Sequence, residues 1–167
     1  ARRMIPLSPG ERLLVYGIGN PGRQDDAMGV RVVERLGAQP LPATVTLDAN
    51  YQITPEDALT LSHHDVVIFV DATVAPVAPE PYSLQPVEPR AVNAFSSHTL
   101  AMSTVLDLCV RLYGRAPRAY ALALPAYEFE VNAELSPRAA ANLADACDAL
   151  TRLVCHPRAD VTPVLGV

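Results

Sequence analysis

The 167-residue sequence has little positive charge, with 13 Lys and Arg residues against 18 Asp and Glu residues and a formal net charge of -5. Binding to a phosphate backbone needs a basic surface, so this balance argues against a nucleic-acid partner. Long apolar runs are also missing, and we expect no membrane contact because none approaches the length of a membrane span. Arg2 and Arg3 are followed within a few residues by residues 8–10 (SPG) without an apolar segment, so we expect no export signal.

Cysteine is equally scarce: the sequence has only Cys109, Cys147 and Cys155, and none forms a C-x-x-C pair. All three lie in helical patterns rich in Ala, Val and Leu, which is typical of small buried apolar residues rather than of a metal or redox site. Unpaired cysteines suit a reducing compartment, and we expect a cytoplasmic protein. The G-x-S-x-G pattern of a serine nucleophile is missing as well.

Half of the residues are hydrophobic and 19% are charged, which is the composition of a globular protein that buries a core. Strands that alternate with helices predict one α/β domain over residues 1–167. It is a three-layer sandwich in which helices cover both faces of a mainly parallel, twisted sheet of about five strands. We expect a loose arm at residues 1–11 and a loose tail at 156–167. The expected strands are 12–18, 43–48, 65–71, 82–87 (an edge strand) and 119–124, and the expected helices are 26–36, 54–64, 96–113 and 136–155.

A glycine-rich loop at residues 17–22 (GIGNPG) joins the first strand to the first helix. Its glycines allow a sharp turn and a close approach to whatever lies above the sheet. Asp25 and Asp26 follow at the helix start, close to the carboxyl end of a strand, where open α/β sheets bind their ligands. The G-x-G-x-x-G spacing resembles a dinucleotide-binding loop, but two acids at this place would repel a pyrophosphate.

Three polar residues occupy matching places in the expected fold. Asp26 follows the loop of the first strand, Asp71 ends the strand at 65–71, and His98 opens the helix at 96–113. If these segments are neighbours, two carboxylates and an imidazole meet at the carboxyl edge of the sheet, a set that suits Ni²⁺ or Zn²⁺. Each residue also has a simpler interpretation, because either acid can cap a turn or helix and a lone histidine is more often packed or hydrogen-bonded. His63 and His64 are expected to end a helix.

Taken in order, five segments resemble the nickel-iron hydrogenase maturation endopeptidases over about residues 13–153. The matching segments are residues 17–20 (GIGN), 25–31 (DDAMGVR), 68–72 (IFVDA), 96–98 (SSH) and 134–137 (ELSP). In that family an acid three residues before a glycine, the acid that ends the central strand and the histidine after the serine turn bind the metal. The resemblance therefore implies Asp26, Asp71 and His98 as metal-binding and catalytic residues, and the spacing to Gly29 favours Asp26 over Asp25.

The resemblance also implies an activity. It is that of a cytosolic endopeptidase that removes the C-terminal extension of a hydrogenase large-subunit precursor after nickel insertion, with nickel carried by the substrate and no organic cofactor. We expect a monomer, because binding one precursor needs no oligomer. Many family members have a glycine-threonine-glycine turn after the second strand, where this sequence has residues 48–52 (DANYQ). Asp48 keeps the family's acid and, with Asn20, is assigned to substrate binding.

Two other functions compete. The loop at residues 17–22 also resembles the start of bacterial peptidyl-tRNA hydrolase, but no histidine occurs before His63 and the acidic chain is a poor tRNA ligand. A non-catalytic maturation adaptor on the same fold would keep the docking surface without cleavage.

Overall fold

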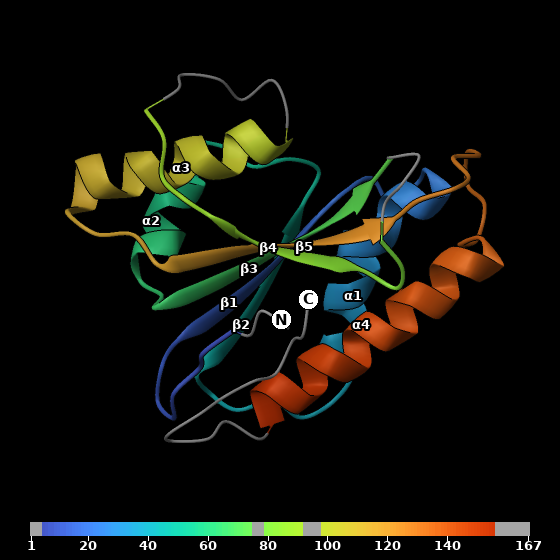
Figure 1. The fold of residues 1–167 in the computed structure, drawn as a ribbon, viewed down its shortest axis with the longest axis horizontal. Coiled ribbons are helices and arrows are strands. Elements are labelled where there is room, and N and C mark those ends of the chain that lie inside the picture. Colours follow the sequence, from blue (N-terminus) through green and yellow to red (C-terminus); the bar gives the residue numbers. More distant parts are fainter. Residues whose placement is uncertain (1–4, 75–78, 92–97, 156–167) are drawn as a thin grey trace.

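The computed structural model describes residues 5–74, 79–91 and 98–155. These residues form a five-stranded sheet flanked by helices (Figure 1). The strands are β1 (Leu13–Ile18), β2 (Val45–Asn50), β3 (Val66–Thr73), β4 (Ser83–Val87) and β5 (Arg118–Pro125). The helices are the short 3-10 helix η1 (Gln24–Ala27) and the α-helices α1 (Met28–Gly37), α2 (Asp57–Ser62), α3 (His98–Tyr113) and α4 (Pro137–Cys155).

The strands lie in the order β2-β1-β3-β5-β4. The first four are parallel, and β4 runs antiparallel to β5 at one edge. Figure 1 shows α1 and α4 on one face of the sheet and α2 and α3 on the other. The expected α/β sandwich is confirmed, and so is the edge strand at 82–87, whose Pro86 has no N–H for a central ladder.

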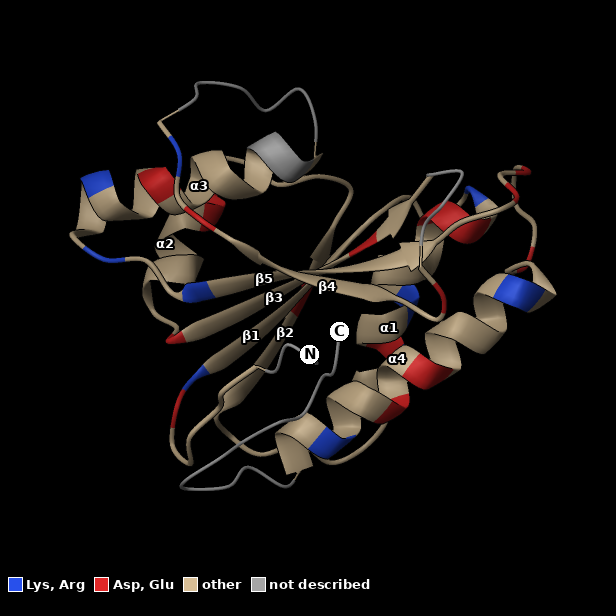
Figure 2. Cartoon of the chain, viewed as in Figure 1, with Lys and Arg blue, Asp and Glu red and all other residues tan. Residues whose placement is uncertain are grey.

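The core has two halves, one on each face of the sheet. β1 and the first six residues of β3 are buried, which explains their continuous apolar runs. Alternate residues point to opposite faces, so Val15 and Ile68 pack with α1 and α4, whereas Tyr16 and Phe69 pack with α2 and α3. Figure 2 shows the charged residues mostly at strand ends and on helices and loops, which leaves the middle of the sheet apolar.

Three expectations are wrong in detail. The arm at 1–11 is not loose throughout, because Ile5 and Leu7 are buried in the core beside α1 and α4. β2 begins at Val45 and continues to Asn50, so Asp48 lies within a strand. The expected helix at 54–64 is the shorter α2, since the Asp57 carboxylate accepts the Thr54 N–H at 2.8 Å and holds residues 54–56 in a turn.

The expectations for residues 1–4, 75–78, 92–97 and 156–167 lie outside the described residues. None of the described helices is long and apolar enough to cross a membrane.

Candidate active site

Asp71 and His98 meet at the carboxyl edge of the sheet. Asp71 is the sixth residue of β3 and lies on the face covered by α2 and α3, and His98 is the first residue of α3. The Nδ1 atom of the His98 ring forms a hydrogen bond with Oδ2 of Asp71. The carboxylate is buried, at 7% exposed, whereas the His98 side chain is 47% exposed. A buried acid therefore holds one ring nitrogen of a histidine that remains accessible.

The charges of this pair are coupled to Asp26. Burial is the strongest influence on the pKa of Asp71 and raises it, against the lowering effect of the His98 hydrogen bond. The hydrogen bond to Asp71 is the strongest influence on the pKa of His98 and also raises it. The negative charge of Asp26 raises both pKa values, so Asp26 lies within electrostatic reach of the pair.

The Asp26 side chain is hydrogen-bonded to the glycine-rich loop that precedes it. It lies in η1, and its Oδ2 atom accepts a hydrogen bond from the backbone N–H of Asn20 at 3.2 Å. Within the described ranges, no group of three or more His, Cys, Asp and Glu side chains is arranged to hold a metal ion. The structure thus joins Asp71 to His98 with Asp26 nearby, and the three-residue nickel site stays a prediction.

One polar atom of the pair is left without a partner. Oδ1 of Asp71 is buried and has no hydrogen-bond partner among the residues that the structure describes. A buried carboxylate oxygen without a donor is costly unless a cation or another donor reaches it. Carboxylate and imidazole are also the ligand types that divalent nickel and zinc accept. The donor set fits a cation that arrives from outside the chain.

Asp25, the neighbour of Asp26, has a structural role. Its carboxylate is fully buried and accepts four hydrogen bonds from the segment that leads into α4. The donors are Tyr127 N at 2.9 Å, Glu128 N at 3.0 Å, Ser136 N at 2.8 Å and Ser136 Oγ at 2.7 Å. Burial alone would raise the pKa of Asp25, but these hydrogen bonds together lower it. Because Asp25 is used to hold the segment before α4, this structural role agrees with the preference for Asp26 as the site residue.

We expect Asp25→Asn to lower the free energy of unfolding at neutral pH by about 3 kcal/mol, because an amide turns donors toward N–H groups that need an acceptor. The pKa of Asp25 is lowered in the folded state, so its stabilisation is present above the ordinary aspartate pKa and is lost as pH falls through the folded value. The difference in unfolding free energy between wild type and variant should therefore become smaller at acidic pH. Urea unfolding at neutral pH and below about pH 4 measures it. A gap that is constant with pH would contradict the assignment.

The two expected substrate-binding residues lie in different places. Asn20 accepts the Gly22 N–H on its side-chain Oδ1 at 2.9 Å, so it shapes the glycine-rich loop. Asp48 is exposed on β2, and its Oδ1 accepts the N–H of Ala49 at 2.8 Å. β2 is separated from β3 by β1, so Asp48 does not join the Asp71–His98 pair. The substrate-binding role of both residues stays a prediction.

Sequence patterns missed some residues of this region and placed others correctly. Gln24, at a positive φ of 47°, donates its side-chain N–H to Glu128 at 2.9 Å, and no sequence signal announces this contact. Ser136, expected to cap the last helix, does so by accepting the Ala139 N–H at 3.3 Å, and it also donates to Asp25. His63 is the C-cap of α2, and His64 follows it with Nδ1 at 2.7 Å from the Thr60 carbonyl.

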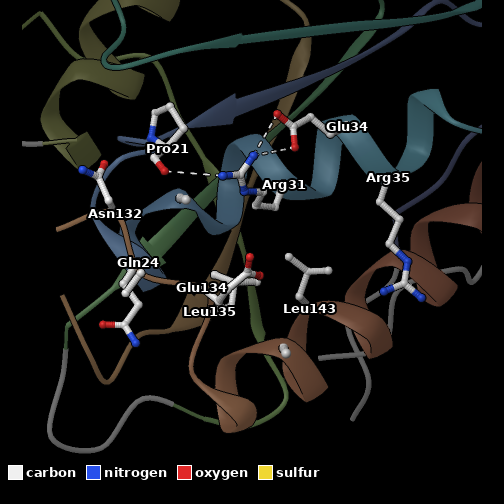
Figure 3. A pocket seen from close by; sticks show the side chains of 12 residues that line it. Pro21, Gln24, Arg31, Glu34, Arg35, Asn132, Glu134, Leu135 and Leu143 are labelled. Carbon is white, nitrogen blue, oxygen red and sulfur yellow. Dashed lines mark hydrogen bonds and ion pairs between the residues drawn. The ribbon is translucent and has the colours of Figure 1, made fainter. Parts of the chain in front are cut away.

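A pocket of about 840 Å³ opens beside the glycine-rich loop, between α1 and the start of α4 (Figure 3). Arg31 crosses it, bonded to Glu34 at 2.8 Å and near the Pro21 carbonyl at 3.4 Å. Asp26, Asp71 and His98 are not among its lining residues. This pocket is therefore separate from the candidate site.

No family model matches the sequence, and no curated protein matches it either. Among solved structures, the hydrogenase maturating endopeptidase HybD from E. coli is similar, with a TM-score of 0.72 and 25% identity over 91% of this chain and 97% of that chain. A solution structure of an endopeptidase from Escherichia coli has a TM-score of 0.67 and 25% identity over the same shares. The chain is similar to a hydrogenase maturation endopeptidase over most of its length. This similarity supports a protease.

The fold is also shared with a solved structure of lower sequence identity. The [NiFe] hydrogenase maturation protease HycI from Thermococcus kodakarensis KOD1 has a TM-score of 0.69 at 21% identity, over 89% of this chain and 96% of that chain. At that identity the similarity shows the fold alone. The family resemblance drawn from the ordered sequence motifs is confirmed.

Proposed function

We propose that this protease removes the C-terminal extension from the large-subunit precursor of a nickel-iron hydrogenase after nickel has been inserted. The nickel arrives with the substrate and is bound by Asp26, Asp71 and His98. The observation that carries the proposal is the Asp71–His98 pair, with a buried oxygen that lacks a donor and an accessible imidazole at one edge of the sheet. The hydrogenase proteases among the similar structures support the class of substrate.

The residues of the chain prepare this edge for a cation. When Nδ1 of His98 donates to Asp71, the other ring nitrogen, Nε2, keeps its lone pair for a metal. Oδ1 of Asp71 has no hydrogen-bond partner among the described residues, and Asp26 accepts the Asn20 N–H on Oδ2. Asp26, Asp71 and His98 would hold a divalent ion there, and such an ion would supply Lewis acidity toward a carbonyl or a water, so that no serine or cysteine nucleophile would be needed.

A nickel-loaded precursor and its nickel-free form, incubated separately with the protein, test this function. We expect the C-terminal extension to be lost only from the loaded form, seen as a mass decrease of the large subunit. An intact precursor held in a stable complex would instead indicate an adaptor, and no binding at all would refute the substrate. The peptidyl-tRNA hydrolase alternative is set aside because the similar solved structures are hydrogenase maturation proteases.

We expect Asp71→Asn to slow processing by about 10- to 100-fold, because an amide keeps the shape of the carboxylate but loses the charge that holds the imidazole and the metal. Rates of extension loss from the nickel-loaded precursor measure the effect. The matched control is Asp107→Asn on the surface of α3, which removes only an ion pair with Arg111. If both variants process at the wild-type rate, Asp71 has no part in metal binding or processing.

The proposal also covers partner and place. One chain binds one precursor as a monomer, without nucleic acid or membrane. Cys109 and Cys147 are buried and free, which supports a reducing compartment such as the cytoplasm.

A further inference from the structure

β2 forms an open edge of the sheet. On one side it pairs with β1, and no other strand in the described part of the chain pairs with it. Gly19 N donates to the Asn50 carbonyl at 3.1 Å, so Asn50 turns its backbone groups toward β1. Alternation along a parallel strand then turns the N–H and C=O of Leu47 and Ala49 away from β1. These groups face outward along the edge.

The outward donors at the carboxyl end of β2 are held by neighbouring side chains. Ala49 N donates to Oδ1 of Asp48 and, just past the strand, Tyr51 N donates to Oδ1 of Asn50, each at 2.8 Å. The carbonyls of an adjoining strand would accept hydrogen bonds from the same two N–H groups, which lie two residues apart. The two side chains thus take the place of an absent neighbour, and each can rotate away when one arrives.

The two edge strands of the sheet differ in their proline content. β4 contains Pro86 and is flanked by Pro81 and Pro89, and proline is a common device against strand addition. β2 (Val45–Asn50) has no proline and no basic residue. The sheet therefore offers strand pairing at β2.

This edge leads to the candidate site. The Asn50 carbonyl is bonded to Gly19, and the next residue, Asn20, donates its backbone N–H to Asp26. The carboxyl end of β2 is therefore one short loop away from the site acids. A peptide lying along β2 would continue over this loop toward Asp71.

We propose that β2 binds an extended peptide as a sixth, antiparallel strand, and that this peptide is the C-terminal extension of the precursor. This rests on the proposed function. The cleaved bond would lie at the carboxyl edge of the sheet, beside Asp71 and His98. After the cleaved bond, the extension starts at the carboxyl end of β2 and proceeds toward the amino end of β2. The pairing is therefore antiparallel.

Strand geometry sets the length of peptide required. Adjacent strands are about 4.8 Å apart, so the added strand lies about 14 Å from β3, a span of about four extended residues. Residues beyond about the fourth of the extension pair with β2. Asp48 is exposed on this strand and β2 carries no cation, so a basic side chain in the paired part complements the edge.

Ala49→Pro tests the edge directly. Proline removes an outward N–H and adds a ring there, yet it keeps the β1–β2 ladder because the Ala49 N–H faces away from β1. The matched control is Ala49→Val, which adds bulk but keeps the N–H. On the full nickel-loaded precursor, we expect Ala49→Pro to lower kcat/KM by about tenfold, mainly through KM, and Ala49→Val to change it by less than about threefold.

A shortened substrate separates this proposal from the function on which it rests. When the extension is cut to about four residues, wild type and Ala49→Pro should cleave at equal rates, because neither peptide reaches β2. Equal rates of the two proteins on the full precursor would overturn strand addition and leave the protease function standing. No cleavage of either precursor by wild type would overturn the function itself.

Hydrogen exchange of the wild-type chain tests the proposal even if the Ala49→Pro variant fails to fold. With a synthetic peptide of the extension sequence in excess, the amides of Leu47 and Ala49 should exchange more slowly, and unchanged exchange there overturns the proposal. Light scattering covers the remaining occupant, a second copy of this chain. A dimer that Ala49→Pro dissociates would assign the edge to self-association instead.

Discussion

His98→Ala is expected to reduce processing of the nickel-loaded precursor by at least about a hundredfold while the fold is retained. The side chain is half exposed at the first residue of α3, so its loss removes no core packing. Its loss does remove the imidazole bonded to Oδ2 of Asp71, whose Oδ1 has no hydrogen-bond partner in the described part of the chain. The rate of extension loss, with circular dichroism as a check on folding, measures the effect.

His63→Ala is the matched control for this prediction. His63 is also exposed, but it lies at the end of α2 at the amino edge of the sheet, away from the candidate site. Its replacement should leave processing unchanged. Wild-type processing by His98→Ala would eliminate His98 as a ligand, whereas equal losses in both variants would point to a general effect of removing histidine.

The positions of Asp71 and His98 illustrate how far the sequence could lead. The run of β-branched and aromatic residues that closes on Asp71 predicts a central parallel strand, and such strands present their carboxyl ends at one edge. The helix that begins at His98 follows from its apolar pattern. That the two side chains touch depends on packing between α3 and β3, and no local pattern carries that information.

Asp25 and Asp26 show the opposite case. Both acids occupy the same helix start, and local chemistry alone gives them the same capping role. The family resemblance favours Asp26 by its spacing to Gly29, but only the fold shows what Asp25 does: the segment that contains Tyr127 and Ser136 packs over Asp25 and buries it. Asp48 is a similar case: β2 extends two residues further than its local pattern indicates, which makes an expected turn into an edge strand.

Gly29→Ala is expected to be strongly destabilising, costing about 3 kcal/mol or more of unfolding free energy. A Cβ atom at Gly29 would lie 2.3 Å from the carbonyl oxygens of both Ile18 and Val70. These are backbone atoms of β1 and β3, so no side chain can rotate to make room. The first turn of α1 would have to move away from the sheet, which thermal unfolding should record as a Tm lower by about 10 °C.

Gly37→Ala, in the last turn of the same helix, is the matched control. Its Cβ would meet only the Cδ1 atom of Leu47, at 3.3 Å, and a terminal methyl group can move. Alanine also favours the helical state over glycine, so the expected change is within about 1 kcal/mol. Because Gly29 lies three residues after Asp26, the shift of α1 in Gly29→Ala should also displace that carboxylate and slow processing. A Gly29→Ala protein as stable as Gly37→Ala would show that the sheet does not fix the position of α1.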